Sequence, residues 1–169
     1  MRSTRSEYWA ERRIHLVDIE NMCRGFVTPT SARAFAEAYA TAGVLGWADH
    51  VVVGTSPASV VQTYSLPRGW RRVLGAAGPD GADIALADAL PDGLLLTSFD
   101  GLVIASGDHY FCKVAIAASK AGLHVSLVTT KDTLISAELY RLAEDHIVLP
   151  LRATPRTPAG TVPGPRKEL

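Results

Sequence analysis

The sequence predicts an α/β fold with three α/β/α layers, in which helices cover both faces of a central, mainly parallel sheet. Six short runs rich in Val, Ile and Leu show little polar alternation, as expected for strands buried on both faces. Segments with helical patterns separate these runs. A regular alternation of strand and helix along the chain is typical of a parallel sheet.

The expected strands are apolar runs of five or six residues. In chain order they are "IHLVD" (14–18), "DHVVVG" (49–54), the weaker "WRRVLG" (70–75), "GLVIAS" (101–106), "HVSLVT" (124–129) and "HIVLPL" (146–151).

Five helices are expected between these strands. The segment 30–43 has a Thr or Ser cap at its start and a glycine stop at its end. The other expected helices are residues 56–65, 81–90, 111–122 and 134–145.

One domain is expected over residues 12–150, with an N-terminal extension (1–11) and a C-terminal tail (151–169). The tail is rich in Pro, Gly, Thr and Arg, so it is expected to be flexible. Apolar residues make up 47% of the chain and charged residues 20%, which is typical of a soluble globular protein. The apolar runs are too short to cross a bilayer and the N-terminus is polar, so no membrane partner and a cytoplasmic location are expected.

The charge balance and the two cysteines exclude few classes of function or partner. Seventeen basic and seventeen acidic residues balance, so only a local basic patch would indicate a nucleic acid partner. Cys23 and Cys112 lack the spacing of a metal site and are expected to be reduced. The sequence leaves open whether the chain forms a homodimer or has a protein partner.

Acidic residues follow the ends of several expected strands. In open parallel sheets, ligands bind beyond the carboxyl ends of the strands, where the strand order reverses. Asp18, Glu20 and Asn21 follow the first strand, Asp83 lies in the helix start after the third, and Asp108 follows the fourth. Three carboxylates at one edge would repel one another without a cation, so we expect a hard divalent ion there.

Each acid also has a structural interpretation. Asp18 can bond nearby backbone amides in a turn, Asp83 can gain from the helix dipole, and Asp108 can cap the next helix. Asp88 lies five residues after Asp83 and therefore points to another side of the helix. Glu20 is expected either to support the site or to face solvent.

Four motifs, in order, resemble those of the NYN domain family, a branch of the PIN-like metal-dependent nucleases. The likeness as a whole extends over roughly residues 12–150, and the motifs are spaced along that range. The motifs are "LVDIEN", "GPDGADIALADAL", "VIASGDHYF" and "HVSLVTTKDTLISAELYRLAEDHIVL". The resemblance implies a PIN-like fold with the strand order 3-2-1-4-5. Many family members have a further acid where this chain has Tyr110, so a second metal site is expected to be weak.

The resemblance also implies a function: a ribonuclease that hydrolyses RNA phosphodiester bonds with Mg²⁺ or Mn²⁺. Asp18, Asp83 and Asp108 would hold the metal, and Asn21 would complete the catalytic set. Substrate contacts are expected from Asn21, His109, Arg24 and Ser106, with further basic contacts from Arg68, Arg71, Arg72, Lys113 and Lys131. Two alternatives remain: a non-catalytic RNA-binding or scaffold module, favoured by Tyr110, and a PIN-like toxin component.

Overall fold

A computed structural model of the chain describes residues 11–90 and 98–151, and in it six parallel strands form one sheet. The sheet order is β3-β2-β1-β4-β5-β6, which confirms the predicted α/β class and the predicted order and adds a sixth strand beside β5. The strands are β1 (Arg13–Asp18), β2 (His50–Thr55), β3 (Arg71–Leu74), β4 (Gly101–Ala105), β5 (His124–Thr130) and β6 (Asp145–Leu149).

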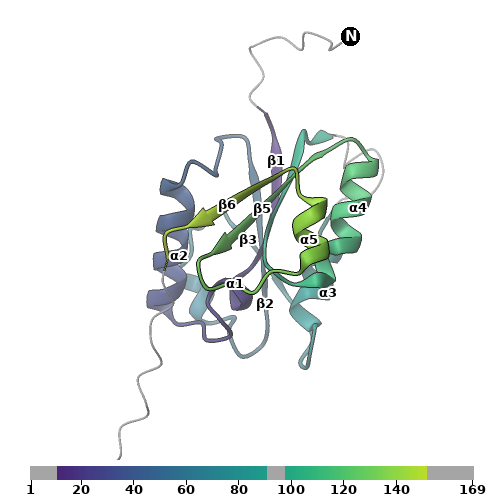
Figure 1. The fold of residues 1–169 in the computed structure, drawn as a ribbon. Helices are drawn as coiled ribbons and strands as arrows, with labels where there is room; N and C mark the ends of the chain where they lie inside the picture. The colour runs from purple at the N-terminus through teal and green to yellow at the C-terminus, as the bar shows by residue number, and fades with distance from the viewer. Residues whose placement is uncertain (1–10, 91–97, 152–169) are drawn as a thin grey trace, which may run out of the picture.

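Helices cover both faces of the sheet, as Figure 1 shows with α2 on one side and α3, α4 and α5 on the other. A separate apolar core lies on each face. One core packs the sheet against α3, α4 and α5, and the other packs it against α2. The α-helices are α1 (Ile19–Met22), α2 (Pro29–Thr41), α3 (Gly81–Asp88), α4 (Cys112–Lys120) and α5 (Ala137–Leu142), and two 3-10 helices are η1 (Gln62–Ser65) and η3 (His109–Phe111).

The expected helix over residues 56–65 is wrong. The segment forms turns followed only by the short 3-10 helix η1. Most backbone hydrogen bonds in this segment reach only three residues back, which is the pattern of turns and 3-10 helices. The Ser56 amide and the Ser59 hydroxyl bond Glu20, a partner outside the segment. The helix expected over residues 134–145 is also shorter, because Ser136 caps α5 at its start.

The helix α2 starts at Pro29, one residue before its expected range, and ends at Thr41. Its cap is Thr28, whose hydroxyl oxygen accepts a 3.0 Å hydrogen bond from the Ser31 amide, while the Ser31 hydroxyl oxygen accepts a 2.8 Å bond from the Thr28 amide. Pro29 occupies the first helical position, where its missing N–H costs nothing. The glycine stop is confirmed, because Gly43 takes a φ of +70° just past the helix.

A buried polar network lies at the amino ends of the strands, at the opposite end of β1 from Asp18. His15, fully buried on β1, contacts the Tyr39 hydroxyl at 2.8 Å and the Asp49 carboxylate at 3.0 Å. Asp49 also accepts hydrogen bonds from the Arg13 guanidinium and the Gly46 amide. Burial lowers the pKa of His15 despite its contact with Asp49, so His15 stays neutral near pH 7. We assign this network to fold stability.

The predicted N-terminal extension lies almost entirely outside the described residues, and the tail beyond residue 151 lies outside them too. Within the described ranges, no helix has the length and apolar character needed to cross a bilayer. Both cysteines are free thiols, with Cys112 buried and Cys23 partly buried.

Candidate acidic site at the carboxyl ends of the strands

A cavity of about 450 Å³ opens at the carboxyl ends of the strands. Its walls come from the segments that follow β1, β2, β3, β4 and β5. The strand order reverses between β1 and β4, which is where open parallel sheets bind ligands. The polar side chains that line the cavity are Asp18, Glu20, Asn21, Arg24, Ser56, Asp80, Asp83, Asp108, Asp132 and Thr133.

Asp18 is the last residue of β1 and only 7% exposed. One carboxylate oxygen, Oδ1, accepts a 3.0 Å hydrogen bond from the Asn21 amide, so the predicted turn cap is present. The other oxygen, Oδ2, accepts a 2.9 Å bond from the Ser106 hydroxyl. The cap and a functional role are compatible, because the same bonds fix the carboxylate at the cavity wall.

The environment of Asp18 disfavours its charged form. Burial raises the pKa of Asp18 from 3.8 to about 6, and the charges of Glu20 and Asp108 act in the same direction. The hydrogen bonds from Asn21 and Ser106 oppose this shift without cancelling it.

Asp83 lies in the first turn of α3 and shares this electrostatic environment. Burial raises the pKa of Asp83 from 3.8 to about 7, followed by repulsion from Asp18, Asp108, Asp80 and Glu20. The dipole of α3 alone would lower the pKa of Asp83. Because the pKa is raised, burial and the neighbouring carboxylates outweigh the dipole. Together with Asp108, the two predicted acids therefore form one self-repelling cluster.

Two glycines set the position of Asp83. A Cβ on Gly75 would lie 2.1 Å from the Gly81 carbonyl oxygen, and a Cβ on Gly81 would lie 2.1 Å from the Ala76 carbonyl oxygen. The end of β3 and the start of α3 thus approach at a distance that only glycine allows. This contact brings the first turn of α3 to the rim of the cavity.

Asp108 follows β4 and caps η3, as predicted, by accepting a 2.8 Å hydrogen bond from the Tyr110 amide. Its own amide donates a 3.1 Å bond to the Ser106 hydroxyl oxygen. Asn21 holds the same turn, because its side-chain oxygen accepts a 3.0 Å bond from the Gly107 amide. Gly107 has no room for a Cβ, which would lie 2.1 Å from the Leu134 carbonyl oxygen.

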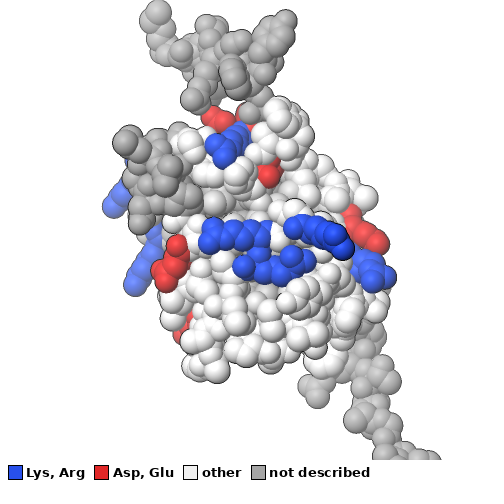
Figure 2. Space-filling model, turned by 180° about the vertical axis from the view of Figure 1, so that it is seen from behind, with Lys and Arg blue, Asp and Glu red and all other residues white. Residues whose placement is uncertain are grey.

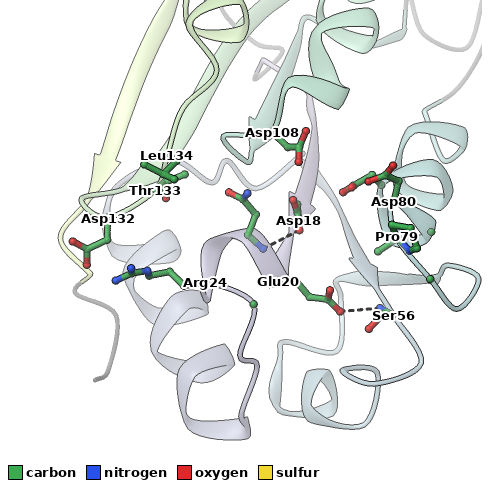
Figure 3. A pocket seen from close by; sticks show the side chains of 16 residues that line it. Asp18, Glu20, Arg24, Ser56, Pro79, Asp80, Asp108, Asp132, Thr133 and Leu134 are labelled. Carbon is green, nitrogen blue, oxygen red and sulfur yellow. Dashed lines mark hydrogen bonds between the residues drawn. The ribbon is translucent and has the colours of Figure 1, made fainter. Parts of the chain in front are cut away.

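Figure 3 shows how the labelled side chains lie around the cavity. Asp18 lies between Asp108 and Glu20, with Asp80 across the opening and Arg24 on the opposite side. Glu20 accepts a hydrogen bond from the Ser59 hydroxyl at 2.5 Å and from the Ser56 amide at 3.3 Å. Burial raises the pKa of Glu20, but these hydrogen bonds outweigh it and leave the pKa below its ordinary value. Glu20 is therefore ionised near neutral pH and adds a negative charge to the cavity wall.

Two residues of the cavity wall have an unusual backbone. Among the described residues, Arg24 (φ 58°) and Asp80 (φ 59°) are the non-glycine residues with positive φ, and both line the cavity. Arg24 follows α1, where its amide bonds the Asn21 carbonyl oxygen and the Gly25 amide bonds the Glu20 carbonyl oxygen. This pair of bonds is a Schellman motif, whose left-handed position normally holds glycine. Strain of this kind often accompanies function.

Some predicted site residues lie apart from the cavity. Ser106 is fully buried behind Asp18, so it positions that carboxylate in place of the substrate contact that the sequence predicted. His109 is exposed on η3 and does not line the cavity. Nor do the other basic candidates, Arg68, Arg71, Arg72, Lys113 and Lys131.

Neither Asp80 nor Asp132 was predicted to belong to the site, and the role of Glu20 was left open. Asp132 follows the end of β5, so the strand-end rule used for Asp18 and Asp108 would also have found it. Glu20 becomes part of the site only because α1 turns back toward Ser56 and Ser59, and no local pattern reveals that contact.

The donor set suits a hard cation, but the geometry sets a limit. In residues 11–90 and 98–151, no group of three or more His, Cys, Asp or Glu side chains is arranged to hold a metal ion. The predicted three-carboxylate chelate is therefore not preformed in that part of the chain. Mg²⁺ keeps several waters and commonly uses one or two carboxylates together with substrate phosphates. The cluster fits an ion held in that way.

Comparisons with known proteins bear on the fold. No family model matches the chain, and no curated protein matches it. The structure is similar to the crystal structure of a protein of unknown function from Vibrio parahaemolyticus, with a TM-score of 0.59 and 15% sequence identity. The match covers 85% of this chain and 95% of the other. At this identity the likeness concerns the fold alone.

Proposed function

We propose that the chain is a ribonuclease that hydrolyses RNA phosphodiester bonds with the help of Mg²⁺ or Mn²⁺. The observation that carries this proposal is the carboxylate cluster of Asp18, Asp83 and Asp108 at the strand-order reversal. Burial and mutual repulsion raise the pKa of Asp18 to about 6 and that of Asp83 to about 7. A cation relieves such repulsion, and the backbone phosphate of a nucleic acid is a ligand that brings its own oxygens to the ion.

The proposal extends the resemblance to the NYN family, whose pattern places acids at the same three positions. Asp18 would hold the cation together with Asp83 or Asp108. Some of these carboxylates would contact the ion through a water molecule. A bound Mg²⁺ or Mn²⁺ would neutralise charge on the phosphate and lower the pKa of the attacking water. Asp18 keeps its orientation through Ser106, so its free electron pairs remain directed at the cavity.

Two further residues are suited to the phosphate. The Asn21 side-chain oxygen is used by the Gly107 amide, which leaves its NH₂ group to donate to a phosphate oxygen. Arg24 supplies positive charge at the cavity wall, in a left-handed conformation that few residues other than glycine adopt. Neither residue needs to move a proton.

Cleavage of labelled RNA tests the proposal. We expect hydrolysis by the purified chain in Mn²⁺ or Mg²⁺ and none in excess EDTA. Asp18→Asn and Asp108→Asn should each reduce the rate by at least a hundredfold, as the loss of a group that stabilises transition-state charge does. Lys120→Ala serves as a control, because this exposed residue ends α4 at the side of the sheet where β5 begins, away from the carboxyl ends of the strands. Cleavage that survives both changes, or that persists in EDTA, contradicts the proposal.

A non-catalytic RNA-binding module is the second candidate, and one observation favours it. Many NYN proteins have another carboxylate where this chain has Tyr110. Tyr110 lies near the acids of α3: burial raises the pKa of its hydroxyl, and the charges of Asp88, Asp83 and Asp80 raise it further. Titration calorimetry with Mn²⁺ separates the two candidates. Absence of binding at millimolar Mn²⁺, together with RNA binding in EDTA, favours the module over the enzyme.

A further inference from the structure

The strand β3 forms one edge of the sheet and carries a concentration of arginines. It pairs with β2 on one side, and in the described part of the chain no strand pairs with its other side. Arg71 and Arg72 begin the strand, and Arg68 lies three residues before it. Figure 2, which looks at the molecule from the side opposite to β6, shows a band of Lys and Arg side chains across the middle of this face. Arg68, Arg71 and Arg72, with the exposed ring of Tyr64, are called the β3-edge surface below.

Arg72 is held in place by its neighbours. Its guanidinium donates to the carbonyl oxygens of Thr63 (3.0 Å), Leu66 (3.0 Å) and Trp70 (3.2 Å). A guanidinium has five N–H donors, so two remain for a ligand. Little conformational entropy is lost when such a fixed group binds.

Arg68 and Arg71 are exposed, and none of the three arginines has a carboxylate partner among residues 11–90 and 98–151. The whole chain is electrically neutral, with seventeen basic and seventeen acidic residues. Three unpaired positive charges on one edge are therefore a local excess. An excess of this kind attracts the phosphate backbone of a nucleic acid.

The ring of Tyr64 lies beside Arg72 and is 74% exposed. The Arg72 guanidinium lies 5.9 Å from the centre of the ring. An exposed aromatic ring next to arginines is a platform on which an unpaired base stacks. A base in a duplex is not available for such a contact, so the surface favours a single strand.

The β3-edge surface leads directly to the acidic cavity. The strand runs toward its carboxyl end at Leu74, which is 58% exposed, and Gly78, Pro79 and Asp80 then line the cavity. Arg72 is two residues from the strand end, about 7 Å at the usual rise per residue. A strand with one phosphate at the acids thus reaches the arginines within a few nucleotides.

We propose that the β3-edge surface binds the single-stranded RNA that flanks the phosphate in the acidic cavity. This inference rests on the proposed function for the choice of RNA and assigns its substrate class as single-stranded. Charged residues on an edge strand also prevent edge-to-edge association. The experiment separates these two roles.

Binding is measured by fluorescence anisotropy in EDTA, with a labelled 12-nucleotide single strand and a duplex of the same sequence. The variant Arg68→Ala/Arg71→Ala leaves the structural Arg72 unchanged. The matched control is Lys120→Ala/Arg141→Ala, which removes the same charge from two exposed residues, one on α4 and one on α5. We expect the wild type to bind the single strand more tightly than the duplex.

The arginine variant should weaken single-strand binding by about tenfold and reduce the slope of log K against log salt by about 1.4, which is 0.7 for each lost phosphate contact. Tyr64→Ala should weaken binding of the single strand by about fivefold or more and leave duplex binding unchanged. The control should bind like the wild type. Equal affinity and equal salt slope in the arginine variant and the wild type overturn the inference. So does self-association of the variant, by size-exclusion chromatography, with unchanged RNA affinity.

Cleavage in Mn²⁺, measured separately, keeps the two proposals apart. Arginine-dependent binding of a single strand without any cleavage supports the β3-edge surface and contradicts the ribonuclease. Cleavage of RNA, with an RNA affinity that does not depend on Arg68 or Arg71, supports the ribonuclease and contradicts the β3-edge surface.

Discussion

The Ser106 hydroxyl donates a 2.9 Å hydrogen bond to Oδ2 of Asp18, and its oxygen accepts a 3.1 Å bond from the Asp108 amide. Ser106 is fully buried, so water does not replace either bond. One hydroxyl thereby couples the end of β1 to the turn after β4. The two strands flank the point where the strand order reverses, and the coupling fixes two acids of the cavity relative to each other.

We expect Ser106→Ala to lower the free energy of unfolding by about 1–3 kcal/mol, because it leaves the buried Asp18 Oδ2 and the partly buried Asp108 amide without these partners. The loss of a hydrogen bond to the charged form should also raise the pKa of Asp18 further above 6. Denaturant unfolding and NMR titration of the Asp18 carboxyl measure the two effects. Ser59→Ala, which removes a hydroxyl bonded to Glu20, is the matched control and should leave the pKa of Asp18 nearly unchanged. An unshifted Asp18 in Ser106→Ala contradicts the coupling.

The sheet could be predicted from sequence because its strands are buried on both faces and read as continuous apolar runs. The positions of Asp18 and Asp108 follow from the same rule, since Asp18 ends one such run and Asp108 lies just past the end of another. The link through Ser106 could not be predicted, because it joins residues 88 positions apart through side chains.

The failures also have physical causes. Residues 56–65 have a helical apolar pattern, but Ser56 and Ser59 turn to Glu20, a residue 36 or more positions away. The orientation of Asp83 depends on the close approach of Gly75 and Gly81, which a local pattern does not contain. Local propensity was therefore sufficient for the sheet and insufficient for the loops that form the cavity.

The raised pKa values of Asp18 and Asp83 give the metal-free protein a pH dependence. Both acids hold protons more tightly when folded than at the ordinary value of 3.8, so their stabilising contribution is complete below about pH 4. It is lost as the pH rises through about 6 and 7. For Asp18, a shift from 3.8 to about 6 corresponds to about 3 kcal/mol. Asp18→Asn lacks this titration. In EDTA, the unfolding free energy of the variant minus that of the wild type should therefore increase by about 3 kcal/mol as the pH rises from 4 to 8.

Denaturant unfolding at several pH values measures that difference. Comparing variant with wild type cancels the contribution of His15, whose lowered pKa stabilises the fold in the opposite direction as the pH rises. A difference between variant and wild type that is constant from pH 4 to pH 8 contradicts the account. In wild type, added Mn²⁺ should stabilise more at pH 8 than at pH 5, because at pH 5 the ion has to displace protons.

Arg24 offers a test of strain at the cavity wall. It occupies the left-handed position of a Schellman motif, so Arg24→Gly should raise the free energy of unfolding by about 0.5–1 kcal/mol. Arg24→Ala keeps the strain and should not gain stability. Both changes remove the positive charge and should reduce RNA cleavage to a similar degree. Thermal unfolding and cleavage rates measure the two effects, and equal stability of the Gly and Ala variants would show that the backbone here is unstrained.

Under the proposed resemblance to the NYN family, Tyr110 stands where many members have an acid. Its environment is acidic, because Asp88, Asp83 and Asp80 raise the pKa of the Tyr110 hydroxyl after burial does. A carboxylate there would add to the repulsion around Asp83, which a divalent cation relieves. Tyr110→Asp should therefore bind Mn²⁺ about tenfold more tightly than the wild type and be less stable in EDTA at pH 8. Tyr110→Asn is the control, because it also removes the ring contact with Phe111 and keeps the backbone bond to Asp108 without adding charge. Titration calorimetry measures the affinities, and equal Mn²⁺ affinity in the Asp and Asn variants would show that position 110 is too far from the ion to act on it.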